Sequence, residues 1–119
     1  SLRTQLTNSE IIRSLAKTAG WNPLLSASDQ RTGIVLLQSD RLSIQSLSPE
    51  SLRRQMQQGG VTATAYDAGI IRLSMPRTML TSDELQHIES LLQRLSADNG
   101  YRLAVDGQVP ADGTTIAAC

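Results

Sequence analysis

Apolar and polar residues recur along the chain with two different periods, and the first third of the chain contains both. Apolar residues at helical spacing follow the capping sequence Asn8–Glu10, which predicts a helix that ends at Gly20. The segment Trp21–Gln30 is predicted to be a loop. Thr32–Gln38, which reads TGIVLLQ, is a continuous apolar run typical of a strand buried on both faces. Leu42–Ile44 is predicted to be a second, short extended piece.

The middle of the chain predicts a helix followed by a β-hairpin. Ser48 is a favoured N-cap, a proline follows it at the first helical position, and Gly59–Gly60 ends the helix. Val61–Tyr66 alternates β-branched and small residues. A tight turn then leads into Ile70–Met75, so the two segments are predicted to pair as antiparallel strands.

The last part of the chain predicts a long amphipathic helix. Thr81 and Glu84 have the spacing of a capping box, and apolar side chains recur on one face of the helix that follows. Asn99–Gly100 is predicted to end this helix, and Tyr101–Val105 is predicted to form a last strand. The chain turns polar and glycine-rich from Asp106 onward, which predicts a loose tail.

Taken in order, these elements predict an α+β fold. The expected architecture is a two-layer sandwich, in which a mainly antiparallel sheet carries helices on one face and is preceded by an N-terminal helix. The chain has 119 residues, which is enough for one hydrophobic core and too few for two. Residues 1–105 are therefore predicted to form a single domain, and residues 106–119 a polar C-terminal tail.

Composition excludes several classes of function. Eleven basic and eleven acidic residues cancel, so the chain lacks the concentrated positive charge that nucleic acids and acidic membranes attract. The single cysteine, Cys119, excludes an internal disulfide and a thiolate metal site. No segment is long and apolar enough to span a bilayer, and no signal sequence opens the chain, so we expect a cytoplasmic protein.

The most informative residue is an arginine inside the apolar segment Ile70–Met75. Strand alternation places Arg72 with Ser74 on the face opposite to Ile71 and Leu73, and the latter pair suits a face covered by helices. Arg72 would then lie on the open face. An arginine there holds a carboxylate through two parallel hydrogen bonds, whereas lysine cannot match that geometry. The alternative is an ordinary solvated arginine.

Other residues point to no catalytic set. His87 is the only histidine, and Lys17 the only lysine; both are predicted to be solvated helix residues. Gly59–Gly60 lies where a helix ends, whereas phosphate loops precede helix starts.

Four segments together resemble a known family. They are TGIVLL, the helix that ends in QQGGV, the short hairpin, and GIIRLSMPRTMLTSDELQHIESLLQRL. This order is similar to the C-terminal small domain of fold-type I pyridoxal-phosphate enzymes, and most similar to the aminotransferase class V group. The likeness covers Thr32–Leu95, and the helix Ser9–Gly20 would match the helix that enters the small domain in that family.

The resemblance implies that Arg72 binds the α-carboxylate of the substrate, whereas Ser74 beside it has no assigned role. The family's cofactor lysine, the acid that pairs with the pyridine nitrogen and the phosphate loop belong to a large domain that this chain lacks. The chain is therefore expected to be a separated small domain, or a relative without the catalytic part, and to be inactive alone without its own pyridoxal phosphate. The implied partners are the large domain of the parent protein and an amino-acid or other carboxylate substrate.

Two other functions stay open at this point. The element order also fits a ferredoxin-like sandwich, of the sort that binds amino acids between paired subunits, so a non-catalytic regulatory module and a homodimer are both compatible with it. The third reading is a protein-interaction domain that uses the open sheet face, with Arg72 as a surface charge. The coding sequence upstream of Ser1 separates the first function from the others.

Overall fold

The computed structural model describes residues 1–24 and 33–106, with side chains up to residue 97. Within these ranges the chain forms four strands and four helices. In chain order they are α1 (Leu2–Thr18), β1 (Trp21–Leu24), β2 (Ile34–Ser39), α3 (Leu42–Gln45), α4 (Pro49–Gln58), β3 (Thr64–Tyr66), β4 (Ile70–Ser74) and α5 (Ser82–Asp106).

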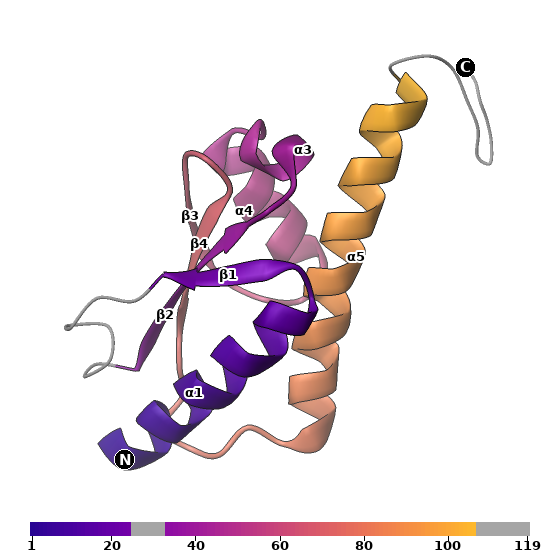
Figure 1. Ribbon diagram of the computed structural model, residues 1–119. Coiled ribbons are helices and arrows are strands. Elements are labelled where there is room, and N and C mark those ends of the chain that lie inside the picture. The colour runs from indigo at the N-terminus through magenta and orange to yellow at the C-terminus, as the bar shows by residue number, and fades with distance from the viewer. Residues whose placement is uncertain (25–32, 107–119) are drawn as a thin grey trace.

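The predicted α+β architecture is confirmed. The four strands form one antiparallel sheet in the order β1-β2-β4-β3, and the helices gather beside it (Figure 1). Both β2 and β3 pair antiparallel with β4, so β2 and β3 run in the same direction with β4 between them. The connection from β2 to β3 passes through α3 and α4, which makes a split β-α-β unit.

The hydrophobic core lies between the sheet and the helices. In β2 and β4 every second residue is buried: Val35 and Leu37 alternate with half-buried residues, and Ile71 and Leu73 alternate with residues that are half-buried or exposed. Trp21 is fully buried at the start of β1, and its Nε1 donates a hydrogen bond to the carbonyl of Leu92 in α5, 3.0 Å away. The remaining core comes mainly from aliphatic side chains of the helices: Ile12, Ala16, Ile44, Leu52, Met56, Leu91 and Leu95.

The prediction of a loop over Trp21–Gln30 is wrong for its first part, because Trp21–Leu24 forms β1. Burial of the indole ring fixes the start of this segment against α5, and the segment then pairs with β2. Pro23 is compatible with a strand here because β1 lies at the sheet edge, where one side of the strand needs no ladder hydrogen bonds. The rest of the predicted loop, residues 25–32, lies outside the described residues.

Two predictions about the helices are wrong, and one is confirmed. The first helix begins at Leu2, not after Asn8, because the side chain of Ser1 accepts a hydrogen bond from the Thr4 amide and caps it. Leu42–Ile44 is not extended but belongs to the single helical turn α3, which buries Ile44 against the core. The long C-terminal helix starts at the predicted capping box, in which the Thr81 hydroxyl and the Glu84 carboxylate each accept a hydrogen bond from the other's amide.

The predicted last strand at Tyr101–Val105 is wrong, since α5 continues as a helix to Asp106. The Asn99–Gly100 pair does not stop the helix: a glycine within a helix costs only about 1 kcal/mol relative to alanine. The fourth strand of the sheet is supplied by β1 instead. Residues 107–119, most of the predicted tail, lie outside the described residues.

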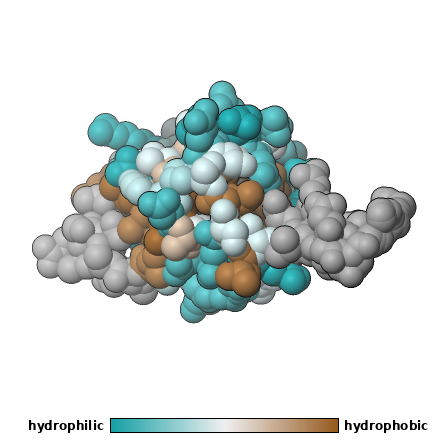
Figure 2. All heavy atoms as spheres, turned by 90° about the horizontal axis from the view of Figure 1, so that it is seen from above, coloured by the Kyte–Doolittle hydropathy of each residue, from teal (hydrophilic) through white to brown (hydrophobic). Residues whose placement is uncertain are grey.

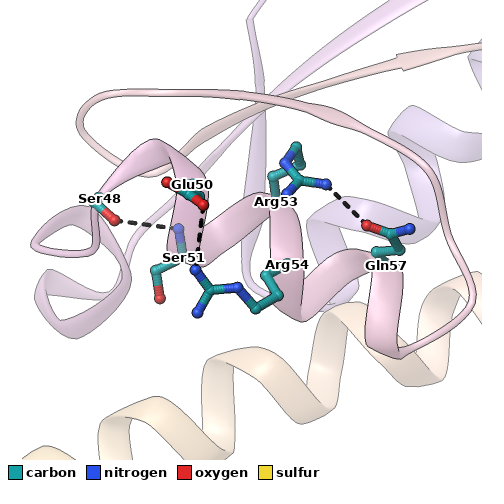
Figure 3. Close-up of polar contacts among 6 residues, drawn as sticks. All are labelled: Ser48, Glu50, Ser51, Arg53, Arg54 and Gln57. Carbon is teal, nitrogen blue, oxygen red and sulfur yellow. Dashed lines mark hydrogen bonds and ion pairs between the residues drawn. The ribbon is translucent and has the colours of Figure 1, made fainter.

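The helix over Pro49–Gln58 and the hairpin agree with the prediction. Ser48 caps α4 by accepting a hydrogen bond from the Ser51 amide (Figure 3). Arg53 and Arg54, the adjacent basic pair, are both engaged along this exposed helix: Arg53 donates to Gln57 at 2.8 Å, and Arg54 lies 3.5 Å from Glu50 (Figure 3). Such exposed i,i+4 contacts contribute about 0.3–0.5 kcal/mol each.

A buried asparagine ties the first helix to the segment that follows β4. The Asn8 side chain donates to the carbonyls of Pro76 and Thr78, at 3.2 and 2.9 Å, and accepts from the amide of Leu80 at 3.2 Å. One turn earlier, Gln5 donates to the Met75 carbonyl at 3.1 Å. The end of β4 is therefore held by side chains of α1, although about seventy residues separate the two segments.

Among the described residues, no helix combines the length and the apolar character that crossing a membrane requires.

Candidate functional site

One row of residues crosses all four strands on the sheet face away from the helices. Strand pairing sets Leu24 of β1 opposite Leu36 of β2, Leu36 opposite Arg72 of β4, and Arg72 opposite Thr64 of β3. Directly paired residues point to the same side of a sheet, and neighbouring strands lie about 4.8 Å apart. Arg72 therefore has an aliphatic side chain on one side and a hydroxyl-bearing one on the other.

The rows next to this one enlarge the apolar surface. Ile70 pairs with Tyr66 in one row, and Ile34 pairs with Ser74 in the other. Together these side chains form a shallow depression of about 450 Å³, whose lining residues are Leu24, Ile34, Leu36, Tyr66, Ile70 and Arg72. Of these only Tyr66 is exposed, while the others are half-buried. In the view from above, apolar residues reach the surface between hydrophilic ones (Figure 2).

Among the described residues that line this depression, Arg72 is the only charged one. It lies on the predicted face, and its side chain is half-buried. Within residues 1–24 and 33–97, no side chain or carbonyl forms a hydrogen bond or ion pair with its guanidinium group. Ser74 lies on the same face, is exposed, and stands two residues further along the strand. The orientation of Arg72 is thus as predicted, whereas its role as a carboxylate ligand stays a prediction.

His87 lies at a different place, beside the end of α4. Its ring Nε2 is 2.7 Å from the carbonyl oxygen of Gly59, so the contact links α5 to the residue after α4. His87, Asp83 and Glu84 line a second open depression of about 410 Å³. In the part of the chain with described side chains, no group of three histidine, cysteine or acidic residues could hold a metal ion.

The described residues do not fit pyridoxal phosphate. Lys17 is exposed in the last turn of α1, a helix that packs on the covered face of the sheet. The Gly59–Gly60 pair follows the C-terminal end of α4, where the helix dipole repels a phosphate. A cofactor of this kind would have to be held by residues outside the described part of the chain.

Sequence reasoning identified the arginine but missed part of the surface around it. The sequence pattern predicts a loop at Leu24 and therefore does not place this residue at the end of the row. The one local signal is Trp21 itself, because aromatic residues are enriched in strands. Tyr66 was placed in the correct strand, but the register that brings it beside Ile70 depends on the turn.

The turn between β3 and β4 sets that register. Ala68 and Gly69 both have positive φ angles, 63° and 72°, which allow the chain to reverse over residues 67–69.

No protein-family model matches this chain, and no curated protein matches it either.

Proposed function

We propose that the chain is the C-terminal small domain of a pyridoxal-phosphate-dependent, aminotransferase-like protein, and that Arg72 binds the carboxylate of its substrate. The observation that carries the proposal is a half-buried arginine in the middle of a largely apolar sheet face, whose guanidinium group has no partner among the described residues.

The surroundings of Arg72 favour an anionic ligand. A cation that loses part of its hydration against aliphatic side chains gains when an anion replaces the lost water contacts. The guanidinium fork matches a carboxylate through two parallel, charge-assisted hydrogen bonds, and such bonds contribute about 1.5–3 kcal/mol. None of the described residues that line the depression is acidic, so none of them competes for the arginine.

The uncovered sheet face is also suited to packing against a second domain. Its aliphatic side chains are half-buried, and no helix of the described chain covers them. In the proposed arrangement a large domain of the same protein packs near this face and holds the cofactor. The substrate then lies between the two domains, in the cytoplasm.

This chain's own contribution would be positioning. Holding the carboxylate on a sheet residue fixes one end of the substrate, which aligns the remaining bonds without any chemistry by the arginine itself. The chain alone is expected to be inactive. Pyridoxal phosphate, when bound by the large domain, would supply the electron sink for the reaction.

The coding sequence upstream of the Ser1 codon tests the domain assignment. We expect roughly two to three hundred residues of α/β sequence there, more than a typical single domain, with a lysine after a short strand. The longer protein should bind pyridoxal phosphate, measured by its visible absorbance. An initiation codon next to Ser1, with no such sequence before it, would contradict the proposal.

A second candidate is a non-catalytic module that binds a ligand or a protein partner. It is favoured by the split β-α-β unit, with β4 between the parallel strands β2 and β3, which is the central arrangement of ferredoxin-like sandwiches. Such a module would bind carboxylates through Arg72 in the same way, but without any upstream cofactor domain. If neither wild type nor Arg72→Ala binds amino acids or small dicarboxylates, a protein-interaction surface remains.

A further inference from the structure

We propose that the ligand of Arg72 is a monocarboxylate with an aliphatic side chain about as large as that of leucine, and that Thr64 completes the carboxylate site. This inference rests on the proposed role of Arg72 as a carboxylate ligand and specifies which carboxylates it selects. It follows from the unequal chemistry on the two sides of the arginine.

On the β2 side the row that contains Arg72 is apolar. Leu36 lies one strand spacing from Arg72, and Leu24 lies two spacings away, or roughly 10 Å. Ile34 and Ile70 flank this row from the neighbouring rows and line the same depression. A ligand anchored at Arg72 therefore meets Leu36 and then Leu24 along this row, with Ile34 of β2 on one side and Ile70 of β4 on the other.

On the β3 side the surface is polar. Thr64 lies directly opposite Arg72, on the same face, and is exposed. Its hydroxyl can donate a hydrogen bond to a carboxylate oxygen that also accepts one from the guanidinium group. A carboxylate between Arg72 and Thr64 leaves the rest of the ligand over Leu36, so the two sides of the arginine set the ligand's direction.

A second negative charge on the ligand would be disfavoured. The side chain of aspartate or glutamate, pointing the same way, would place its carboxylate against Leu36 and Ile70. No cation other than Arg72 belongs to the described lining of the depression. An ionised group that is partly buried against aliphatic side chains without a partner loses hydration that nothing replaces.

The test uses the chain and four probes of matched structure. They are 4-methylpentanoate; acetate, which lacks the aliphatic part; 4-methylpentan-1-ol, which lacks the carboxylate; and glutarate, which adds a second carboxylate. Binding is followed by the NMR shifts of the Arg72 side-chain N–H groups and of the β2 and β4 amides. We expect 4-methylpentanoate to bind about tenfold more tightly than each of the other three.

Three substitutions test what Arg72, Leu36 and Thr64 each contribute to binding. Arg72→Met should weaken binding of 4-methylpentanoate at least tenfold. Leu36→Ala should remove most of its advantage over acetate, and Thr64→Val should weaken both acids a few-fold and equally. If Thr64→Val leaves both affinities unchanged, the role of Thr64 is wrong.

The outcomes separate this inference from the proposed function. Glutarate binding that equals or exceeds that of 4-methylpentanoate, and is lost in Arg72→Met, would overturn the aliphatic preference and leave the carboxylate role of Arg72 intact. Equal affinity of wild type and Arg72→Met for every probe, or no binding of any probe, would overturn both. Tighter binding of the alcohol than of the acid would show an apolar surface without a carboxylate site and would also overturn both.

Discussion

Arg72 of β4 lies directly opposite Leu36 of β2, and both side chains lie on the sheet face that the helices leave uncovered. Leu36 is aliphatic and cannot form an ion pair, and no other residue of the described chain is bonded to the guanidinium group of Arg72. A substitution at position 36 can therefore give Arg72 a new neighbour while Arg72 itself is kept.

The Leu36→Glu substitution should give Arg72 an ion-pair partner within the protein. The new carboxylate would lie one strand spacing away, close enough for a cross-strand ion pair. Because the guanidinium group would then be engaged, we expect the affinity for a small carboxylate to fall about tenfold or more. The free energy of unfolding should change by less than about 1 kcal/mol, since the position is only half-buried. Isothermal titration and urea unfolding measure the two quantities.

Leu24→Glu is the matched control. It puts the same charge on the same face, two strands away from Arg72. Carboxylate affinity should fall much less than in Leu36→Glu, because the two groups are about 10 Å apart and screened by salt. Equal losses in the two variants would mean that net charge, and not occupation of Arg72, governs binding.

Asn8→Ala should destabilise the fold through the segment after β4. The substitution removes the buried amide that contacts Pro76, Thr78 and Leu80. The backbone groups would lose their hydrogen-bond partner, which is expected to lower the free energy of unfolding by about 1–3 kcal/mol. Ser14→Ala, at an exposed position of the same helix, should change it by less than about 0.5 kcal/mol. Similar stabilities of the two variants in urea would contradict the role of Asn8.

Gly59→Ala should be destabilising because of Leu91. An added Cβ at this position would lie 2.3 Å from Cδ1 of Leu91, a buried side chain of α5. The backbone φ of Gly59 is −84°, so alanine is sterically penalised only by that contact. We expect a loss of about 1–3 kcal/mol. In a Leu91→Val background, which shortens the side chain, the same substitution should cost clearly less; equal costs in both backgrounds would exclude the clash.

Ala68→Gly should stabilise the hairpin. Ala68 has a φ of 63°, and the left-handed conformation costs a non-glycine residue roughly 1–2 kcal/mol. Part of that gain is lost because glycine is more flexible in the unfolded chain, which leaves a net gain of up to about 1 kcal/mol. Ala97→Gly, at an exposed position within α5, should have the opposite sign. Destabilisation by both variants, measured from thermal unfolding, would show that the turn is not strained.

Much of this fold could be predicted from local patterns. The capping box at Thr81, the N-cap at Ser48 and the alternation around Arg72 all depend on residues close in sequence, and each has its counterpart in the structure. The face on which Arg72 lies was predictable for the same reason, because a strand has only two faces.

The errors came from long-range contacts. β1 forms because the Trp21 ring is buried against a residue 71 positions later, and α1 is extended by a segment before Asn8 that contacts residues beyond β4. Such long-range contacts do not alter the hydrophobic periodicity of a short segment, so the sequence pattern does not reveal them. The apolar row across Leu24 and Leu36 was missed for the same reason, since it exists only after three strand pairings are known.

The titration of 4-methylpentanoate into wild type and Arg72→Met tests the central claim most directly. Methionine keeps the length and apolar stem of the side chain and removes only the charge and the hydrogen-bond donors. Because a charge-assisted bidentate pair contributes about 1.5–3 kcal/mol, the dissociation constant should rise at least tenfold in Arg72→Met, with unchanged unfolding in urea. Equal dissociation constants for the two proteins would contradict the assignment of Arg72 as a carboxylate ligand.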